Sequence, residues 1–223
     1  MNACRTPKLT AAALALALLA TPALAAAPGP LPVKLAEGSW LKLEGKSNVH
    51  NFHSEAGELQ VALSGDAAPA SPAALDSLIR TGGVTSLDLS IPVVKMHSGK
   101  DGLDKNMQKA LKADQAPAIK FHLTHYQAAP FAAGGDSLDV RADGTLEVAG
   151  VTKDVQLVAV ERRTANAIEI TGTKPLLMTD FGVKPPTMMM GALRTEDGVV
   201  IHYRLLLAVA ATAAAAAAQE GAR

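Results

Sequence analysis

Apolar and polar residues alternate along several segments of the chain, and this period of two constrains the fold more than any other feature. The last such segment places Val199, Ile201, Tyr203, Leu205 and Leu207 on one face. Earlier segments repeat the pattern, with apolar positions at Leu87, Leu89, Ile91 and Val93, at Ile119, Phe121 and Leu123, at Leu146 and Val148, at Val155, Leu157 and Ala159, and at Ile168 and Ile170. Because successive side chains of a strand point to opposite faces, a single apolar face indicates half-buried antiparallel strands. We therefore predict a mainly β protein.

Short connectors with turn-forming residues separate these segments. We interpret three stretches as turns, namely Gly134-Gly135-Asp136, Asp143-Gly144 and Glu196-Asp197-Gly198. Several short strands joined by such turns predict a sandwich or a barrel. Aromatic residues are scarce, with four Phe, two Tyr and one Trp. Smaller apolar side chains must therefore fill the interior, or part of it is left open for a ligand.

Two segments depart from the alternation. Residues 98–117 predict one amphipathic helix inserted between two strands, with Leu103, Met107 and Leu111 on its apolar stripe. Asp101 or Asp104 is the expected N-terminal cap, and Pro117 prevents continuation. Residues 64–83 are rich in Pro, Ala and Ser and are interpreted as a long loop with a short helical turn at Leu75, Leu78 and Ile79.

The two ends of the chain are not expected to belong to the folded domain. Residues 1–25 combine basic Arg5 and Lys8, an apolar run and a small-residue ending, which is typical of a secretory signal peptide. Cleavage after Ala25 is the first choice and after Ala27 the second. Residues 26–38 are interpreted as a leader segment, residues 39–209 as the β domain and residues 210–223 as an Ala-rich low-complexity tail.

A signal peptide predicts export, which in a bacterium places the mature protein in the periplasm. Cleavage would remove Cys4, the only cysteine, so no disulfide would support the fold. It would also remove two basic residues and no acid, changing the formal net charge from zero to −2. This charge gives no reason to expect nucleic acid as a partner. The apolar run is too short to span a bilayer, so stable membrane insertion is not expected either.

Motifs of catalysis do not stand out in the sequence. The chain has no Gly-x-Ser-x-Gly element between a strand and a helix, no Gly-rich phosphate loop and no cysteine in its mature part. The Asp and Glu residues are interpreted as solvated groups on polar faces. We therefore expect a protein that is not an enzyme.

Histidine and methionine raise the alternative of a periplasmic copper or zinc binder. The pairs His50/His53 and His122/His125 have H-x-x-H spacing, but residues three apart on a strand point to opposite faces. A metal site would need His53 with His125, or His50 with His122, across strands. Otherwise His122 is solvated and His125 lies at the rim.

Three consecutive methionines, residues 188–190, are the candidate ligands for Cu(I), with Met96, His97 and Met178 as further candidates. The competing interpretation is that Pro185 and Pro186 stiffen the entry and the methionines pack in the interior or against an apolar ligand. We favour this second interpretation and predict no metal site.

Five stretches, in this order, resemble the YceI-like family of secreted bacterial proteins. They are WLKLEGKSNVHNFHSEAGELQVAL with its Ser-x-Val-His element, LDLSIPVVKMHSGKDGLDKNMQKAL, QAPAIKFHL, GTLEVAGVTKDVQLVAV, and the Phe-Gly element at Phe181 with the strand that follows. The likeness covers roughly residues 38–208. Two positions depart from the family pattern: Ala116 replaces an aromatic residue before Pro117, and Asp154 replaces a proline.

The resemblance implies an extended, lipocalin-like antiparallel β-barrel of about eight strands that holds a polyisoprenoid or a similar amphiphile. A barrel of that size is just wide enough for one small ligand. We expect transport, storage or sequestration of this lipid, with no separate cofactor and with oligomer formation possible. A filled barrel acting only as a structural or interaction domain is the other alternative. The residues expected to contact the ligand are His50, Phe52, Leu89, Ile91, Phe121, Leu157, Phe181, Met188, Met190 and Tyr203.

Overall fold

The computed structural model describes residues 27–131, 136–188 and 193–210. The predicted signal peptide, Gly134, Gly135, Met190 and the chain after Ala210 lie outside these ranges. The described elements, in chain order, are β1 (Gly29–Pro30), β2 (Val33–Leu35), β3 (Trp40–Ser47), β4 (Asn51–Ala56), β5 (Gln60–Gly65), α1 (Pro72–Arg80), β6 (Val84–Pro92), the 3₁₀ turn η1 (Val93–Lys95), β7 (Met96–His97), α2 (Asp101–Ala110), β8 (Ala118–Pro130), β9 (Leu138–Val148), β10 (Val151–Arg163), β11 (Ile168–Leu177), the 3₁₀ turn η2 (Met178–Phe181), β12 (Thr187–Met188) and β13 (Leu193–Val209).

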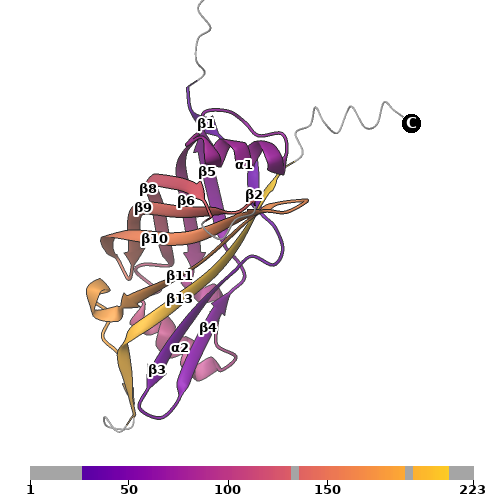
Figure 1. The fold of residues 1–223 in the computed structure, drawn as a ribbon. Helices are drawn as coiled ribbons and strands as arrows, with labels where there is room; N and C mark the ends of the chain where they lie inside the picture. Colours follow the sequence, from indigo (N-terminus) through magenta and orange to yellow (C-terminus); the bar gives the residue numbers. More distant parts are fainter. Residues whose placement is uncertain (1–26, 132–135, 189–192, 211–223) are drawn as a thin grey trace, which may run out of the picture.

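The strands form one curled antiparallel sheet, as Figure 1 shows. The strand order is β1-β5-β6-β8-β9-β10-β11-β13-β3-β4-β7, with β2 and β12 also paired to β13. The prediction of a mainly β, lipocalin-like fold is confirmed. The number of strands is larger than the predicted eight, because the described sheet has 13, including β1, β2, β7 and β12 of only two or three residues.

Residues 29–35 belong to the sheet although the sequence pattern placed them in a leader segment. Here β1 pairs with β5 and β2 pairs with the end of β13. Between these two strands, the Leu31 amide donates to the Leu63 carbonyl over 2.8 Å, and the Leu31 side chain is buried. The segment therefore bridges β5 and β13, which are not direct neighbours, and helps to close the curled sheet.

Two of the predicted turns are strand interiors instead. Asp143 and Gly144 lie within β9, and residues 196–198 lie within β13, where the register with β3 shifts between Thr195 and Val199. The turn that does join β9 to β10 is Ala149-Gly150, with φ of 52° and 80°. Two consecutive residues with positive φ are typical of a tight hairpin that matches the twist of its strands.

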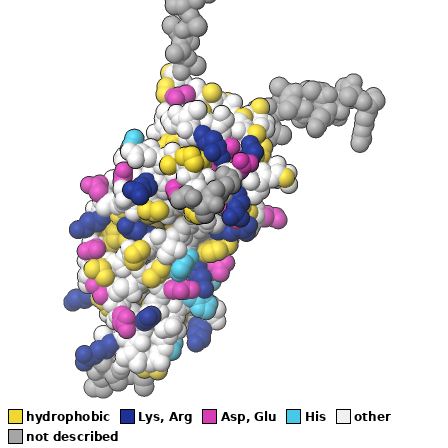
Figure 2. All heavy atoms as spheres, viewed as in Figure 1, with side chains coloured by type: hydrophobic (Ala, Val, Ile, Leu, Met, Phe, Trp, Pro, Cys, Tyr) yellow, Lys and Arg dark blue, Asp and Glu magenta, His cyan; other side chains and the backbone are white. Residues whose placement is uncertain are grey.

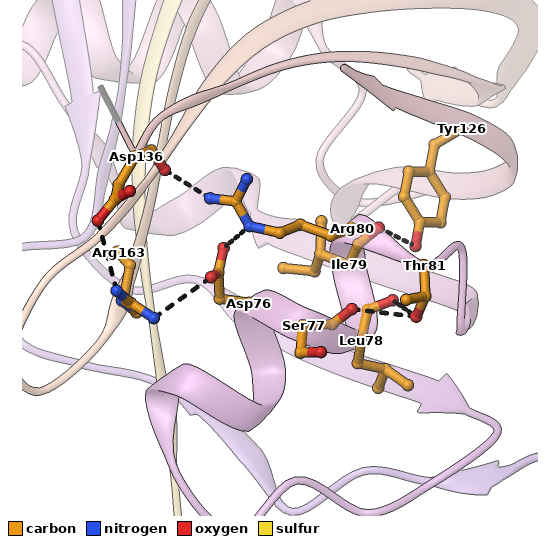
Figure 3. A network of polar contacts seen from close by, with 9 residues as sticks. All are labelled: Asp76, Ser77, Leu78, Ile79, Arg80, Thr81, Tyr126, Asp136 and Arg163. Carbon is orange, nitrogen blue, oxygen red and sulfur yellow. Dashed lines mark hydrogen bonds and ion pairs between the residues drawn. The ribbon is translucent and has the colours of Figure 1, made fainter. Parts of the chain in front are cut away.

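Helix α1 corrects the prediction of a loop with a helical turn at residues 64–83. Its start is stabilised by Ser71, whose hydroxyl accepts a hydrogen bond from the Ala74 amide over 3.2 Å, and by Pro72 in the first turn. Leu75 and Ile79, four residues apart, are both buried. The Tyr126 hydroxyl donates to the Ile79 carbonyl over 3.0 Å, which ties the helix to β8 (Figure 3).

Helix α2 confirms the predicted amphipathic helix, but its cap differs from the prediction. The N-cap residue is Lys100, which makes no side-chain capping bond. Asp104 instead accepts a hydrogen bond from the Ser98 amide over 2.8 Å and so holds the preceding loop. No residue of α2 is fully buried, in contrast to α1. Figure 1 shows α1 and α2 toward opposite ends of the sheet.

The surface carries both signs of charge. Figure 2 shows acidic and basic side chains interspersed over the face in view, with apolar side chains scattered between them. Among the described residues, no helix has the length and apolar character that crossing a membrane requires.

Candidate functional site

An apolar cavity of about 330 Å³ lies inside the curled sheet. Its wall is built from the inward positions of the long strands, such as Val199, Ile201, Tyr203, Leu205 and Leu207 of β13, which confirms the predicted apolar face. Helix α1 contributes Ile79 at one end, and α2 contributes Leu103, Met107 and Ala110 at the other. A cavity of this size falls within the usual range for small-molecule sites.

Most residues predicted to contact a ligand line this cavity. Those that do are His50, Phe52, Leu89, Ile91, Phe121, Leu157, Phe181 and Tyr203. The backbone of Met188 pairs with Leu193 in the short β12–β13 ladder. Met190 lies outside the described residues. Because no ligand contact is described, the binding role of all ten remains a prediction.

Three aromatic rings of the wall each cover a strand glycine. An ideal Cβ atom on Gly45 would lie 2.2 Å from the ring of Phe52, one on Gly144 would lie 2.8 Å from Phe121, and one on Gly172 would lie 2.4 Å from ring carbon Cζ of Tyr203. The rings therefore occupy space that any other residue would fill with its own side chain. Placing the rings against the wall in this way helps to leave the middle of the sheet open.

The Ser-x-Val-His element shapes one rim of the cavity. Ser47 Oγ accepts hydrogen bonds from the amides of Val49 (3.3 Å) and His50 (3.1 Å), and donates to the His50 carbonyl over 2.8 Å. These bonds form the turn between β3 and β4. His50 is exposed yet lines the cavity, as its predicted role as a polar group near the ligand channel requires.

Two tyrosines of the wall have partners for their hydroxyl groups. Tyr203 donates to the Val158 carbonyl over 3.3 Å, and Tyr126 accepts from the Val84 amide over 3.3 Å while donating to Ile79. Burial raises the pKa of Tyr203 to about 12 and also raises the pKa of Tyr126. Both hydroxyls therefore stay neutral and act within the wall.

Glu161 is a buried acidic residue of the cavity wall that sequence reasoning missed. Its side chain is completely buried, and neither carboxylate oxygen has a hydrogen-bond partner in the described chain. Burial, followed by the nearby charge of Asp76, raises the pKa of Glu161 to about 7, against the opposing influence of Arg80 and Arg163. The sequence did indicate this position. Val155, Leu157 and Ala159 alternate in steps of two, and the next step is residue 161, which places Glu161 on the same inner face.

Asp76 of α1 is a second buried carboxylate, also contrary to the prediction that acids are solvated. Its Oδ1 accepts from Arg80 Nε over 2.9 Å, and its Oδ2 lies 3.5 Å from Arg163 Nη1. Arg80 also donates to the Asp136 carbonyl over 2.6 Å, and Arg163 lies 3.5 Å from the Asp136 carboxylate. Figure 3 shows this network joining α1 to the chain beyond β8 and to β10. Both arginines are thus engaged with groups other than Glu161.

The predicted histidine combinations do not come from neighbouring strands of the sheet. β4, which carries His53, is not a neighbour of β8, which carries His122 and His125. His122 is exposed and lies 2.7 Å from Asp88 on the adjacent strand. Within residues 27–131, 136–188 and 193–210, no group of three or more His, Cys, Asp or Glu side chains is placed to hold a metal ion.

Solved structures with the same fold include proteins from two bacteria. BcnA of Burkholderia cenocepacia is 17% identical, with a TM-score of 0.56 over 76% of this chain and 96% of that one. A polyisoprenoid binding domain from Saccharophagus degradans, implicated in plant cell wall breakdown, is 14% identical, with a TM-score of 0.59 over 81% of this chain and 99% of that one. No curated protein matches the sequence.

The family model of the YceI-like domain matches residues 38–206, which is most of the chain and nearly all of its long strands. This match agrees with the motif resemblance and with the curled sheet around an apolar cavity. The chain belongs to the YceI-like domain family.

Proposed function

We propose that this protein is a binding protein that holds one long apolar ligand, such as a polyisoprenoid or an isoprenoid quinone, inside the curled sheet. The observation that carries the proposal is the apolar cavity of about 330 Å³ that extends between the α1 and α2 ends. The polyisoprenoid binding domain from Saccharophagus degradans, which has the same fold, supports this choice of ligand class. Transport, storage and sequestration all fit such a cavity.

The energetics favour a chain of several isoprene units. Each five-carbon unit contributes about 3–4 kcal/mol gross, at about 0.8 kcal/mol per buried CH₂. Association costs about 4–15 kcal/mol in lost freedom, so burial of about four units gives useful affinity without polar contacts. Selectivity for the end of the ligand must then come from the few polar groups of the wall.

Analysis of the copurifying lipid tests this proposal. The protein is purified from its bacterial host without detergent, extracted with organic solvent, and the extract is examined by mass spectrometry. An unrelated exported protein purified in parallel serves as the control. We expect a polyprenyl lipid at near-stoichiometric amount in the first extract alone. Absence of such a lipid, together with no uptake of an added polyprenol or fluorescent fatty probe, would contradict the proposal.

We also propose that the protein acts in the periplasm. The sequence of residues 1–25 supports this location. Amino-terminal sequencing of the protein from a periplasmic fraction tests it, with a start at residue 26 or 28 expected. Recovery of the protein only from the cytoplasmic fraction with an intact amino terminus would argue against export.

A further inference from the structure

Glu161 occupies an inward position that an apolar residue would normally fill. It follows Leu157 and Ala159 on the inner face of β10, and all three line the cavity. Its direct neighbours across the sheet are Leu138 of β9 and Ile170 of β11. A carboxyl group is therefore inserted into an otherwise apolar part of the wall, near helix α1.

The carboxyl group finds no hydrogen-bond partner in the described protein. Both of its oxygens are buried and unsatisfied, although buried polar groups are nearly always hydrogen-bonded. The two cationic side chains that act on the pKa of Glu161, Arg80 and Arg163, are already bonded to Asp76 and Asp136. A buried carboxyl group without a hydrogen-bond partner lowers the stability of the fold. A ligand that donates a hydrogen bond to this group would recover the missing interaction.

We propose that the Glu161 carboxyl group binds the hydroxyl end of the ligand, so that the cavity selects an apolar chain terminated by an alcohol or a phenol. This inference rests on the proposed function and names the end group that the cavity recognises. The hydroxyl end would lie toward α1, and the apolar chain would extend toward α2 and His50.

The charges around Glu161 favour a neutral end group over a charged one. Asp76 acts on this site as a negative charge, and Arg80 and Arg163 act on it as positive charges. The two arginines are offset by the carboxylates of Asp76 and Asp136, so a charged end of either sign would lose its hydration without a net attraction in return. A hydroxyl group both donates and accepts, so it satisfies the carboxyl group in its neutral or its ionised form.

A comparison of three matched ligands tests the proposal. Geranylgeraniol, its O-methyl ether and a hydrocarbon of similar length differ in whether the end can donate a hydrogen bond. For the unaltered protein we expect the alcohol to bind at least about tenfold more tightly than the ether. The ether has no hydroxyl group, so it leaves the buried carboxyl oxygen without a hydrogen-bond donor. The hydrocarbon should bind no better than the ether.

Variants of Glu161 assign this preference to one residue. Glu161→Leu should bind the alcohol and the ether equally, and Glu161→Gln should retain part of the difference. Because the readout is a ratio within each variant, a general change in stability does not mimic the result. Ser54→Ala is the matched control, because Ser54 Oγ is the other buried and unpartnered side-chain group among the described residues and also lines the cavity.

The outcomes separate the two proposals. Equal affinity for alcohol and ether in the unaltered protein, or a preference for the alcohol that persists in Glu161→Leu, overturns the role of Glu161 and leaves lipid binding in place. Failure of all three ligands to bind the unaltered protein overturns both.

Discussion

The ring of Tyr203 on β13 occupies the space above Gly172 on the neighbouring strand β11. The two residues are directly paired in the sheet, and an ideal Cβ on Gly172 would lie 2.2 Å from the Tyr203 hydroxyl oxygen. The same Cβ would lie 2.8 Å from the Val158 carbonyl oxygen, which accepts the Tyr203 hydrogen bond. This contact places the largest side chain of β13 against the wall of the cavity.

We expect Gly172→Ala to destabilise the protein and to reduce the space for a ligand. The added methyl group forces Tyr203 away from the wall, and overpacking of this kind typically costs about 1–3 kcal/mol. Chemical denaturation measures the stability change, and probe titration measures the loss of binding. Gly198→Ala is the control, because a Cβ at Gly198 of β13 meets no atom within 4 Å. Equal stability of the two variants would contradict the close-packing account.

Much of the wall was predictable from sequence because strands have a fixed period of two. Tyr203 and Leu205 are two residues apart on one strand, so their side chains must lie on the same face of the sheet. Phe121 and Leu157 were assigned to inner faces in the same way. The arrangement of these strands around an open cavity depends on tertiary packing, and here the expectation came from the motif resemblance and the scarcity of aromatic residues.

The errors arose where a local signal was overruled by a tertiary contact. Asp143-Gly144 has turn-forming residues, but Gly144 lies inside β9, where an added Cβ would lie 2.3 Å from the His122 carbonyl oxygen and 2.8 Å from the Phe121 ring. The Pro- and Ala-rich stretch before β6 forms helix α1 because Leu75 and Ile79 bury their side chains at one end of the sheet. Glu161 was assigned to a solvated face because carboxylates are rarely buried without a partner.

Glu161 should make the stability of the ligand-free protein fall as the pH rises. Its pKa is raised from 4.5 to about 7 in the folded protein, so the folded state holds the proton more tightly than the unfolded state. The contribution of Glu161 to stability is therefore greatest below about pH 4.5, decreases between about pH 4.5 and 7, and stays at its reduced level above that range. The full loss is on the order of 3 kcal/mol.

Comparison with Glu161→Gln isolates this contribution. The variant cannot ionise at this position, so its free energy of unfolding should rise relative to the unaltered protein as the pH is raised from about 5 to 8. Urea denaturation at several pH values measures the difference. A difference between the two proteins that does not vary with pH would show that Glu161 titrates as an ordinary exposed carboxylate.

Asp76 should influence both stability and the titration of Glu161. Asp76→Asn removes the charge that Arg80 and Arg163 pair with, and we expect a loss of about 1–3 kcal/mol, typical of breaking a buried charged hydrogen bond. Removing the same charge should lower the pKa of Glu161, since Asp76 is one of the causes that raise it.

The pH dependence of the double variant separates these effects. The stability difference between Asp76→Asn and Asp76→Asn/Glu161→Gln should develop at lower pH than the difference measured in the unaltered background. An unchanged pH range would mean that Asp76 and Glu161 do not interact electrostatically.

Occupation of the cavity by a lipid is tested most directly by blocking it from the inside. Ala159 is buried and lines the cavity, whereas its neighbour Val158 is 53% exposed on the outer face of β10. Titration of geranylgeraniol into Ala159→Phe, Val158→Phe and the unaltered protein, with thermal unfolding as a check of folding, gives the comparison. We expect Ala159→Phe to bind at least about tenfold more weakly and Val158→Phe to bind normally, because only the first ring enters the space meant for the ligand. Normal binding by a folded Ala159→Phe protein would show that the lipid is held elsewhere and would contradict the account.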